Sequence, residues 1–237
     1  KSVKSVDKLY LVLAVGLLLT AVWQTIHHFP SYQTLSQSLY VREAMEPLLE
    51  EAPPDSIILA DWHWATPLWY LQEVEGQRPD VTVEYVFPRT ADYGADWANR
   101  IAAEWGNGRA VIATHYDEIA YADLPTPEPS GDAFLFRQEP RLDLPPDFTP
   151  LDLTLGDSLH ITGYNLNQTA VPIGQEAILT LAWQPVSHLQ SPVSLFAHLV
   201  GADGRLVAQQ DLPATPQPDG LTLTQFRLTP RPGALPG

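Results

Sequence analysis

The chain has 237 residues, a formal net charge of −15 at pH 7 and no cysteine. This charge argues against a nucleic-acid partner, because phosphate neutralisation needs clustered Lys and Arg, and no such cluster follows the first eight residues. The lack of cysteine excludes disulfides and zinc–thiolate sites. The chain begins with Lys1 rather than Met and ends at Gly237 without a clear terminal element. We therefore expect a fragment of a longer protein.

An uncharged apolar segment lies near the start, at residues 9–26. Its 18 residues are near the lower limit of the ~17–25 needed to cross a bilayer. Lys1, Lys4 and Lys8 precede it, and the positive-inside rule places such a basic flank in the cytoplasm. We predict a transmembrane helix over residues 1–26 with its flank, and an extracytoplasmic location for the remainder.

Two other interpretations of this segment are open. A secretory signal peptide also has a basic start and an apolar centre, but the bulky residues that follow offer no small-x-small cleavage site. A buried core helix would not carry these flanks. Both the transmembrane helix and the signal peptide put the soluble part outside the cytoplasm.

Helical and strand patterns alternate between residues 27 and 140, which we predict to form one domain. A helix is expected at 31–51, a strand at 56–60, a helix at 66–74 with Pro67 in its first turn, a strand at 81–87, a helix at 92–105, and strands at 109–115 and 133–137. This β-α-β-α-β order predicts a small, mainly parallel, Rossmann-like α/β sheet covered by helices.

From residue 141 onward the helical spacing disappears. Short alternating strands are expected at 151–155, 158–166, 176–185, 193–200, 206–211 and 221–229, with an Asp-Gly hairpin turn at 201–205. This pattern predicts an all-β domain over residues 141–237, an antiparallel β-sandwich that is incomplete because a closing strand pair is missing. The whole fold is thus predicted to be α/β plus all-β.

Two pairs of polar residues follow the first and third predicted strands. In open α/β sheets, ligands bind beyond the carboxyl ends of the strands. If these strands are neighbours, Asp61 and His63 face His115 and Asp117 across one crevice, where they could bind a divalent metal or move a proton. The alternative is that the two acids cap helices and the histidines are surface residues. A non-catalytic ligand contact is the third interpretation.

Residues 61–70 also hold four large aromatic side chains. Sugars present apolar C–H faces that aromatic rings cover, so Trp62 and Trp64 are candidates for a saccharide platform, whereas Trp69 falls on a helical position expected to be buried. Contact with the membrane surface or with a partner domain is an alternative role for Trp62 and Trp64. No nucleophile–base spacing stands out, and we predict no catalytic residue, no metal and no cofactor.

Residues 53–81 resemble the segment after the last membrane helix in bacterial polytopic glycosyltransferases of the GT-C type, in the protein O-mannosyltransferase-like group. Leu68-Trp69-Tyr70, followed by Arg78-Pro79-Asp80, carries the resemblance. Residues 195–211 also resemble a β-sandwich appended to some of these proteins. The family's catalytic acids lie in a first outer loop near N-terminal membrane helices. No residue here matches that loop, and Asp61 and Asp92 are not assigned its role.

The resemblance implies sugar transfer from a polyprenyl-phosphate donor to a glycan or protein acceptor outside the cytoplasm. The expected function is therefore that of an accessory, non-catalytic part of a membrane glycosyltransferase, in contact with the lipid bilayer. A membrane-anchored carbohydrate-binding or interaction module without enzymatic activity is the alternative.

Overall fold

The computed structural model describes residues 3–172, 174–187 and 193–231, and it divides into two units, residues 1–43 and 44–237. Lys1, at the start of the predicted basic flank, and Gly237, at the predicted incomplete end, lie outside the described residues. The fold is α+β, with one long N-terminal helix, a mixed sheet and two antiparallel sheets.

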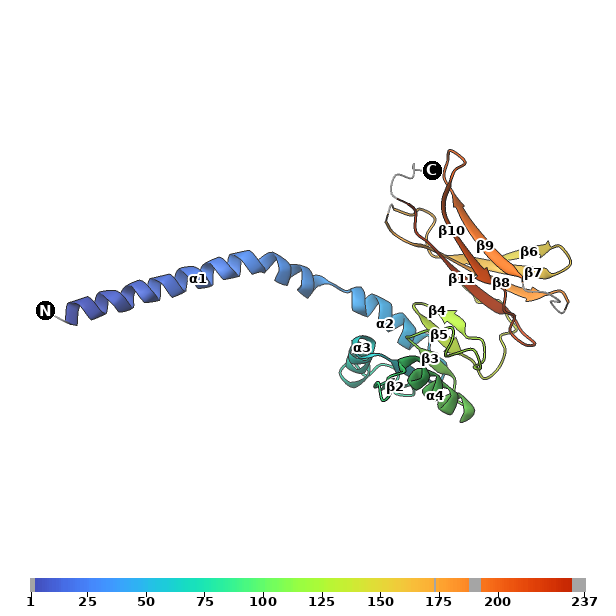
Figure 1. Cartoon of the computed structure of the whole chain (residues 1–237), viewed down its shortest axis with the longest axis horizontal. Coiled ribbons are helices and arrows are strands. Elements are labelled where there is room, and N and C mark those ends of the chain that lie inside the picture. The colour runs from blue at the N-terminus through green and yellow to red at the C-terminus, as the bar shows by residue number, and fades with distance from the viewer. Residues whose placement is uncertain (1–2, 173, 188–192, 232–237) are drawn as a thin grey trace. The chain divides into compact units, whose positions relative to one another are not determined.

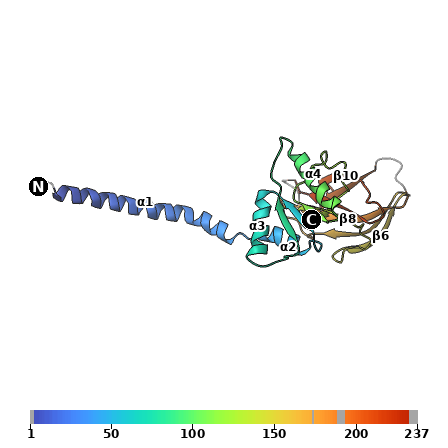
Figure 2. The same ribbon diagram turned by 90° about the horizontal axis from the view of Figure 1, so that it is seen from below.

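The first unit is dominated by α1 (Val3–Gln37), a single helix drawn in blue in Figures 1 and 2. The helical segment Tyr10–Glu50 contains a stretch long and apolar enough to cross a membrane, and none of that stretch is buried. Its threonine hydroxyls donate to backbone carbonyls four residues earlier, Thr20 to Gly16 at 2.8 Å and Thr25 to Ala21 at 2.9 Å. These internal hydrogen bonds satisfy the two polar side chains without water. A signal sequence would pass the same test of length and composition.

The helix predicted at residues 31–51 is interrupted. α1 ends at Gln37, and α2 (Tyr40–Glu50) starts after Ser38 and Leu39. Serine favours helix ends over helix interiors, which accounts for the break. α2 buries its apolar side chains Met45, Leu48 and Leu49.

The mixed sheet has the strand order β2-β1-β3-β5-β4. Its strands are β1 (Ile57–Ala60), β2 (Thr82–Tyr85), β3 (Val111–Ala113), β4 (Glu128–Ser130) and β5 (Ala133–Phe136). β1 pairs in parallel with β2 and β3, as predicted, but β5 is antiparallel to both β3 and β4. The prediction of a mainly parallel sheet was therefore wrong in its second half. Only two residues link β4 to β5, and so short a connection can join antiparallel strands only.

Helices lie on both faces of this sheet. Ile58 and Ala60 of β1 belong to a core cluster with side chains of α2 and of α3 (Trp62–Glu73). Ile57 and Leu59, which alternate with them, belong to a second cluster with α4 (Tyr93–Gly106). Because successive side chains of a strand point to opposite faces, β1 is buried on both sides and reads as a continuous apolar run.

α3 begins four residues earlier than predicted, at Trp62 rather than at residue 66. The carboxylate of Asp61 accepts a hydrogen bond from the backbone N–H of His63 at 3.0 Å, so Asp61 is the N-cap. Pro67 consequently lies inside the helix rather than in its first turn. Asp61 therefore caps a helix, as the alternative interpretation held, and this helix begins directly after it.

The chain after residue 148 forms two antiparallel sheets that share one core. The four-stranded sheet has the order β11-β8-β7-β6 and the other pairs β10 with β9; the strands are β6 (Thr149–Leu155), β7 (Leu159–Leu166), β8 (Ala177–Pro185), β9 (Ser194–Val200), β10 (Leu206–Pro213) and β11 (Thr222–Leu228). All six predicted strands are confirmed within two residues. Trp183 and Phe226 of the larger sheet and Leu195 and Ala208 of the smaller one pack in the same cluster.

Candidate functional site

The carboxyl ends of β1 and β3 meet as predicted. The two strands are parallel neighbours, and the backbone N–H of Asp61 donates to the hydroxyl of Thr114 at 3.3 Å. The imidazole of His63 lies 3.7 Å from the Asp61 carboxylate, but its side chain is 88% exposed and points to solvent rather than into a crevice. Asp61 and His63 therefore form a local pair at the start of α3.

His115 turns toward α4 instead of toward His63. Its ring packs on Trp97 and Tyr93, with ring centroids 5.3 and 5.5 Å apart. Its backbone carbonyl accepts a hydrogen bond from the hydroxyl of Tyr121 at 3.2 Å, and burial raises the pKa of that phenol. His115 therefore packs against the side chains of α4.

Asp117 closes a turn. Its carboxylate accepts hydrogen bonds from the backbone N–H groups of Ile119 at 3.0 Å and Ala120 at 2.9 Å, and it lies directly against Gly94 at the start of α4. The four polar residues predicted to face one another are thus divided among three local environments. Across the described residues, no group of three or more His, Cys, Asp or Glu side chains could hold a metal ion.

A row of aromatic rings crosses the carboxyl end of β2. Trp62 contacts Trp69 and Tyr85 edge-to-face, with centroids 6.1 and 5.6 Å apart, and Tyr85 contacts Phe87 in the same way at 5.9 Å. Trp62 is 57% exposed and Phe87 is 62% exposed. Trp64, the other tryptophan predicted for the platform, is instead partly buried against the core cluster of α2 and α3. The aromatic row is therefore Trp62, Tyr85 and Phe87, in which the two outer rings are exposed and Tyr85 is half-buried against the same core cluster.

Trp69 anchors the row from below. Its indole N–H donates to the backbone carbonyl of Val83 at 3.1 Å, on the outer edge of β2. The ring is partly buried, as predicted from its helical position. This bond fixes α3 against the edge strand. Trp62, about two helical turns before Trp69, is therefore held beside Tyr85.

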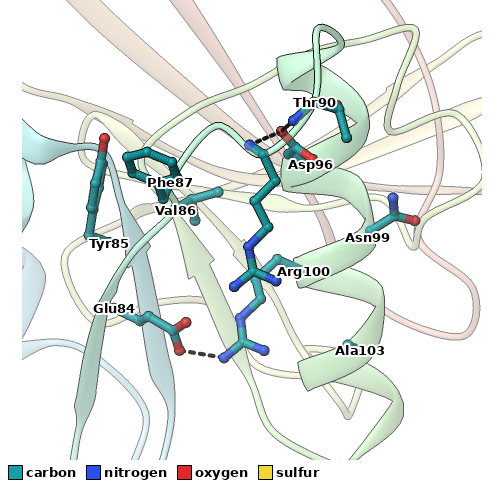
Figure 3. A pocket seen from close by; sticks show the side chains of 10 residues that line it. Glu84, Tyr85, Val86, Phe87, Thr90, Asp96, Asn99, Arg100 and Ala103 are labelled. Carbon is teal, nitrogen blue, oxygen red and sulfur yellow. Dashed lines mark hydrogen bonds and ion pairs between the residues drawn. The ribbon is translucent and has the colours of Figure 1, made fainter.

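On the opposite face of β2, between this strand and α4, lies a pocket of about 360 Å³. In Figure 3, Glu84 and Arg100 turn toward each other in the pocket, whereas the rings of Tyr85 and Phe87 lie on the other side of the β2 backbone and the amide of Asn99 points away. The polar side chains that line the pocket are Glu84, Arg89, Thr90, Asp96, Asn99 and Arg100. Arg100 forms ion pairs with Glu84 and, at 3.1 Å, with Glu104, while its Nε is buried without a hydrogen-bond acceptor.

The rim of this pocket is ordered by Asp96, in the first turn of α4. Its carboxylate accepts hydrogen bonds from the backbone N–H groups of Arg89 at 2.7 Å and Thr90 at 2.9 Å (Figure 3). The hydrogen bond from Thr90 is the main cause that lowers the pKa of Asp96 below its ordinary value, and the bond from Arg89 adds to it. Asp96 thus holds the loop that carries Arg89.

A second pocket of similar volume, also about 360 Å³, lies near Glu128. Glu128 is buried and its carboxylate is bound by Arg141 through two hydrogen bonds of 3.1 Å. Gln138 donates its amide to the backbone carbonyls of Trp105 and Arg109. These polar groups are engaged internally, so this pocket offers a ligand fewer free partners than the pocket beside β2.

Sequence reasoning named Trp62 as a platform candidate but missed the pocket beside β2. The expectation joined only the ends of the first and third strands, whereas the pocket follows the second strand. A signal was present: Tyr85, Phe87 and Arg89 follow the β-branched run of that strand at alternate positions. Comparison with protein-family models, with curated proteins and with solved structures yields no match.

Proposed function

We propose that the chain is a membrane-anchored, extracytoplasmic saccharide-binding region that serves a membrane-embedded glycosyltransferase without performing the chemistry. The row of Trp62, Tyr85 and Phe87 at the end of β2, whose two outer rings are exposed, carries this proposal. The anchoring rests on α1, whose apolar stretch has the length and composition of a membrane span. The partners of this region would be the lipid bilayer, a polyprenyl-phosphate sugar, and a glycan or protein acceptor.

The geometry fits a sugar better than a flat apolar ligand. Aromatic faces cover the C–H face of a pyranose, and the hydroxyls at its edge need hydrogen-bonding partners nearby. The phenol hydroxyl of Tyr85 is such a partner within the row itself.

The fold supports the same assignment at a coarser level. Helices on both faces of the mixed sheet support a Rossmann-like α/β class for the first half. The common core of the two antiparallel sheets supports a β-sandwich for the second half. The accessory role in a GT-C-type glycosyltransferase rests on the resemblance of residues 53–81.

Direct calorimetric titration of the full chain in detergent with a panel of neutral and acidic oligosaccharides tests the binding. We expect saturable binding of at least one sugar, and a loss of about fivefold in affinity for Trp62→Ala, because stacking on an exposed ring contributes on the order of 1 kcal/mol. Tyr70→Ala is the matched control, since Tyr70 is a similarly exposed aromatic residue of the same helix. Calorimetry is preferred to fluorescence because Trp62 is itself a reporter. No binding across the panel would contradict the proposal.

A second measurement tests the accessory role. The chain alone, supplied with a polyprenyl-phosphate sugar and an acceptor peptide or glycan, should transfer no sugar. Measured turnover would overturn the assignment of chemistry to another part of the enzyme, whatever the result of the binding experiment.

A further inference from the structure

α1 continues well past the apolar segment expected to cross the bilayer. That segment ends at residue 26, whereas the helix ends at Gln37. We call residues 27–37 the post-span segment. Charged residues make up 17% of the chain, yet no Asp, Glu, Lys or Arg lies between Lys8 and Arg42. The post-span segment therefore lacks the charged face that a helix surrounded by water usually carries.

The large apolar side chains of the post-span segment lie on one side of α1. Phe29, Tyr32 and Leu35 are spaced three residues apart, which places them along one helical stripe. The rings of Phe29 and Tyr32 contact each other with centroids 6.4 Å apart, and Leu35 is 77% exposed. Because successive helical residues are turned by about 100°, Thr34 and Gln37 lie on the other side. Within the described part of the chain, this stripe has no covering element.

The hydroxyl groups of the post-span segment are bonded inside the helix. Thr34 donates to the backbone carbonyl of Pro30 at 3.0 Å, and Ser36 donates to that of Gln33 at 3.1 Å. Two threonines within the apolar segment make the same kind of bond. Such bonds reduce the demand of these side chains for water. The segment is therefore suited to a surface that is only partly hydrated.

Pro30 gives the post-span segment a direction of its own. Proline lacks a backbone N–H, so the hydrogen bond to the carbonyl of Ile26 is missing where the apolar segment ends. Helices bend at such positions, and α1 is bent rather than straight in Figure 1. The segment can thus leave the axis of the preceding span without ending the helix.

A bilayer surface suits this stripe better than a second helix does. Helices that pack closely in membranes present small residues to each other, whereas this stripe presents Phe29, Tyr32 and Leu35. Tyrosine is favoured at the headgroup level, where its ring contacts lipid and its hydroxyl reaches water. Interfacial helices that bind from solution add Lys and Arg for attraction to lipid. A segment continuous with a membrane span is already held at the surface and does not need them.

We infer that the post-span segment lies along the outer surface of the bilayer, with Phe29, Tyr32 and Leu35 in the lipid and with Thr34 and Gln37 toward water. The inference rests on the membrane anchoring in the proposed function and adds a second contact with lipid. Only residues 38–43 then separate the bilayer surface from the second unit, a reach of at most about 25 Å. The binding region is thereby kept near the leaflet that would present a lipid-linked sugar.

Spin labels on single cysteines test this inference in the full chain, which has no cysteine of its own. Leu18→Cys, Leu35→Cys and Gln37→Cys are labelled separately in phosphatidylcholine nanodiscs. Power saturation then measures collisions with oxygen, which partitions into lipid, and with a water-soluble nickel chelate. We expect the oxygen-to-nickel accessibility ratio at position 35 to be severalfold higher than at position 37, with position 18 also in lipid.

A pair of variants checks the role of the rings. Phe29→Ser combined with Tyr32→Ser should release the segment, so that the label at position 35 becomes accessible to nickel. Gln33→Ser combined with Thr34→Ser is the matched control, because it changes two neighbouring residues away from the centre of the stripe, and it should leave that label in lipid. A label that stays in lipid in the first variant would overturn the contribution of the rings.

The other failures are distinguishable. Nickel accessibility at both 35 and 37, with position 18 in lipid, would overturn the inference and leave the anchoring intact. Protection of position 35 from both reagents would show that another helix or a second copy of the chain covers the stripe, which also overturns it. Nickel accessibility at position 18 would overturn the anchoring of the proposed function together with the inference.

Discussion

Arg78 belongs to the Arg78-Pro79-Asp80 motif on which the family resemblance depends, and the structure gives it a structural role. Its Nη1 donates to the backbone carbonyls of Leu49 at 3.0 Å and Glu50 at 2.7 Å, the last residues of α2. Its Nε and Nη2 bind the carboxylate of Asp80 at 2.9 and 2.7 Å. Arg78 therefore caps the C-terminus of α2, where carbonyl groups lack partners within the helix and a positive charge is favourable.

The loss on replacing Arg78 by alanine follows from these bonds. A hydrogen bond to a charged group contributes about 1.5–3 kcal/mol, but water can replace part of it here, because Glu50 and Asp80 reach solvent. We therefore expect the free energy of unfolding to fall by about 2 kcal/mol in total, which corresponds to a decrease of about 4–8 °C in Tm for a folded unit of this size. Arg78 has a φ of +41°, so Arg78→Gly should lose less stability than Arg78→Ala.

Thermal unfolding of the full chain in detergent, followed by circular dichroism, measures this effect. Arg205→Ala is the matched control, since Arg205 is 85% exposed and its partner Asp203 lies 3.6 Å away. An Arg78→Ala variant as stable as Arg205→Ala would refute the capping role. The Arg78-Pro79-Asp80 motif would then not stabilise the fold by capping α2.

The pH dependence gives a second check on the same residue. The hydrogen bond from Arg78 is the main cause that lowers the pKa of Asp80 from 3.8 to about 2. A carboxylate with a depressed pKa stabilises the folded state above its ordinary pKa, and this contribution is lost as pH falls through the folded value. The stability difference between the wild type and Arg78→Ala should therefore narrow as pH falls from about 5 toward 2. A difference that stays constant would contradict the ion-pair contribution.

Two further predictions concern packing. Gly94→Ala should lower stability by about 1–3 kcal/mol in thermal unfolding, because the added methyl group meets the Asp117 carboxylate and lies 3.0 Å from the Cβ of Ala120; an unchanged Tm would show that the 117–120 turn yields freely. Thr224→Val should cost about 1–3 kcal/mol in the same measurement, because the fully buried Trp183 loses the hydroxyl that accepts its indole N–H at 2.9 Å, and Thr224→Ser should restore most of it.

Local patterns predicted most of the strands and the main N-terminal helix. The six strands after residue 148 are short runs separated by turn residues, and β7 and β9 alternate buried with more exposed side chains, so their limits follow from short-range chemistry. The Gly201–Arg205 turn is an example: Gly204 takes a φ of +77°, and the backbone N–H of Gly201 bonds to the carbonyl of Arg205 at 2.9 Å. The start of α3 was missed because its first turn carries bulky aromatic residues. The predicted helix began at residue 66, whereas the observed helix begins directly after its N-cap, Asp61.

β4 and the direction of β5 could not be predicted from local signals. Residues Glu128-Pro129-Ser130 contain a proline and no apolar alternation, and they form a strand only because an edge position beside β5 tolerates a missing backbone donor. The antiparallel placement of β5 next to β3 depends on long-range pairing. No pattern within either segment specifies which strand becomes its neighbour.

The amino-acid sequence by itself determined a charge that argues against nucleic acid, an apolar N-terminal segment, helical caps at single acids, and the two-residue periodicity of the C-terminal strands. Each of these depends on residues within a few positions of one another. Tertiary structure alone decided which side chains share a surface. It separated His63 from His115, turned Trp64 toward the core, and brought Trp62 of α3 beside Tyr85 of β2. A binding site is assembled from segments far apart in the chain, so its geometry exists only once the sheet order and the helix packing are known.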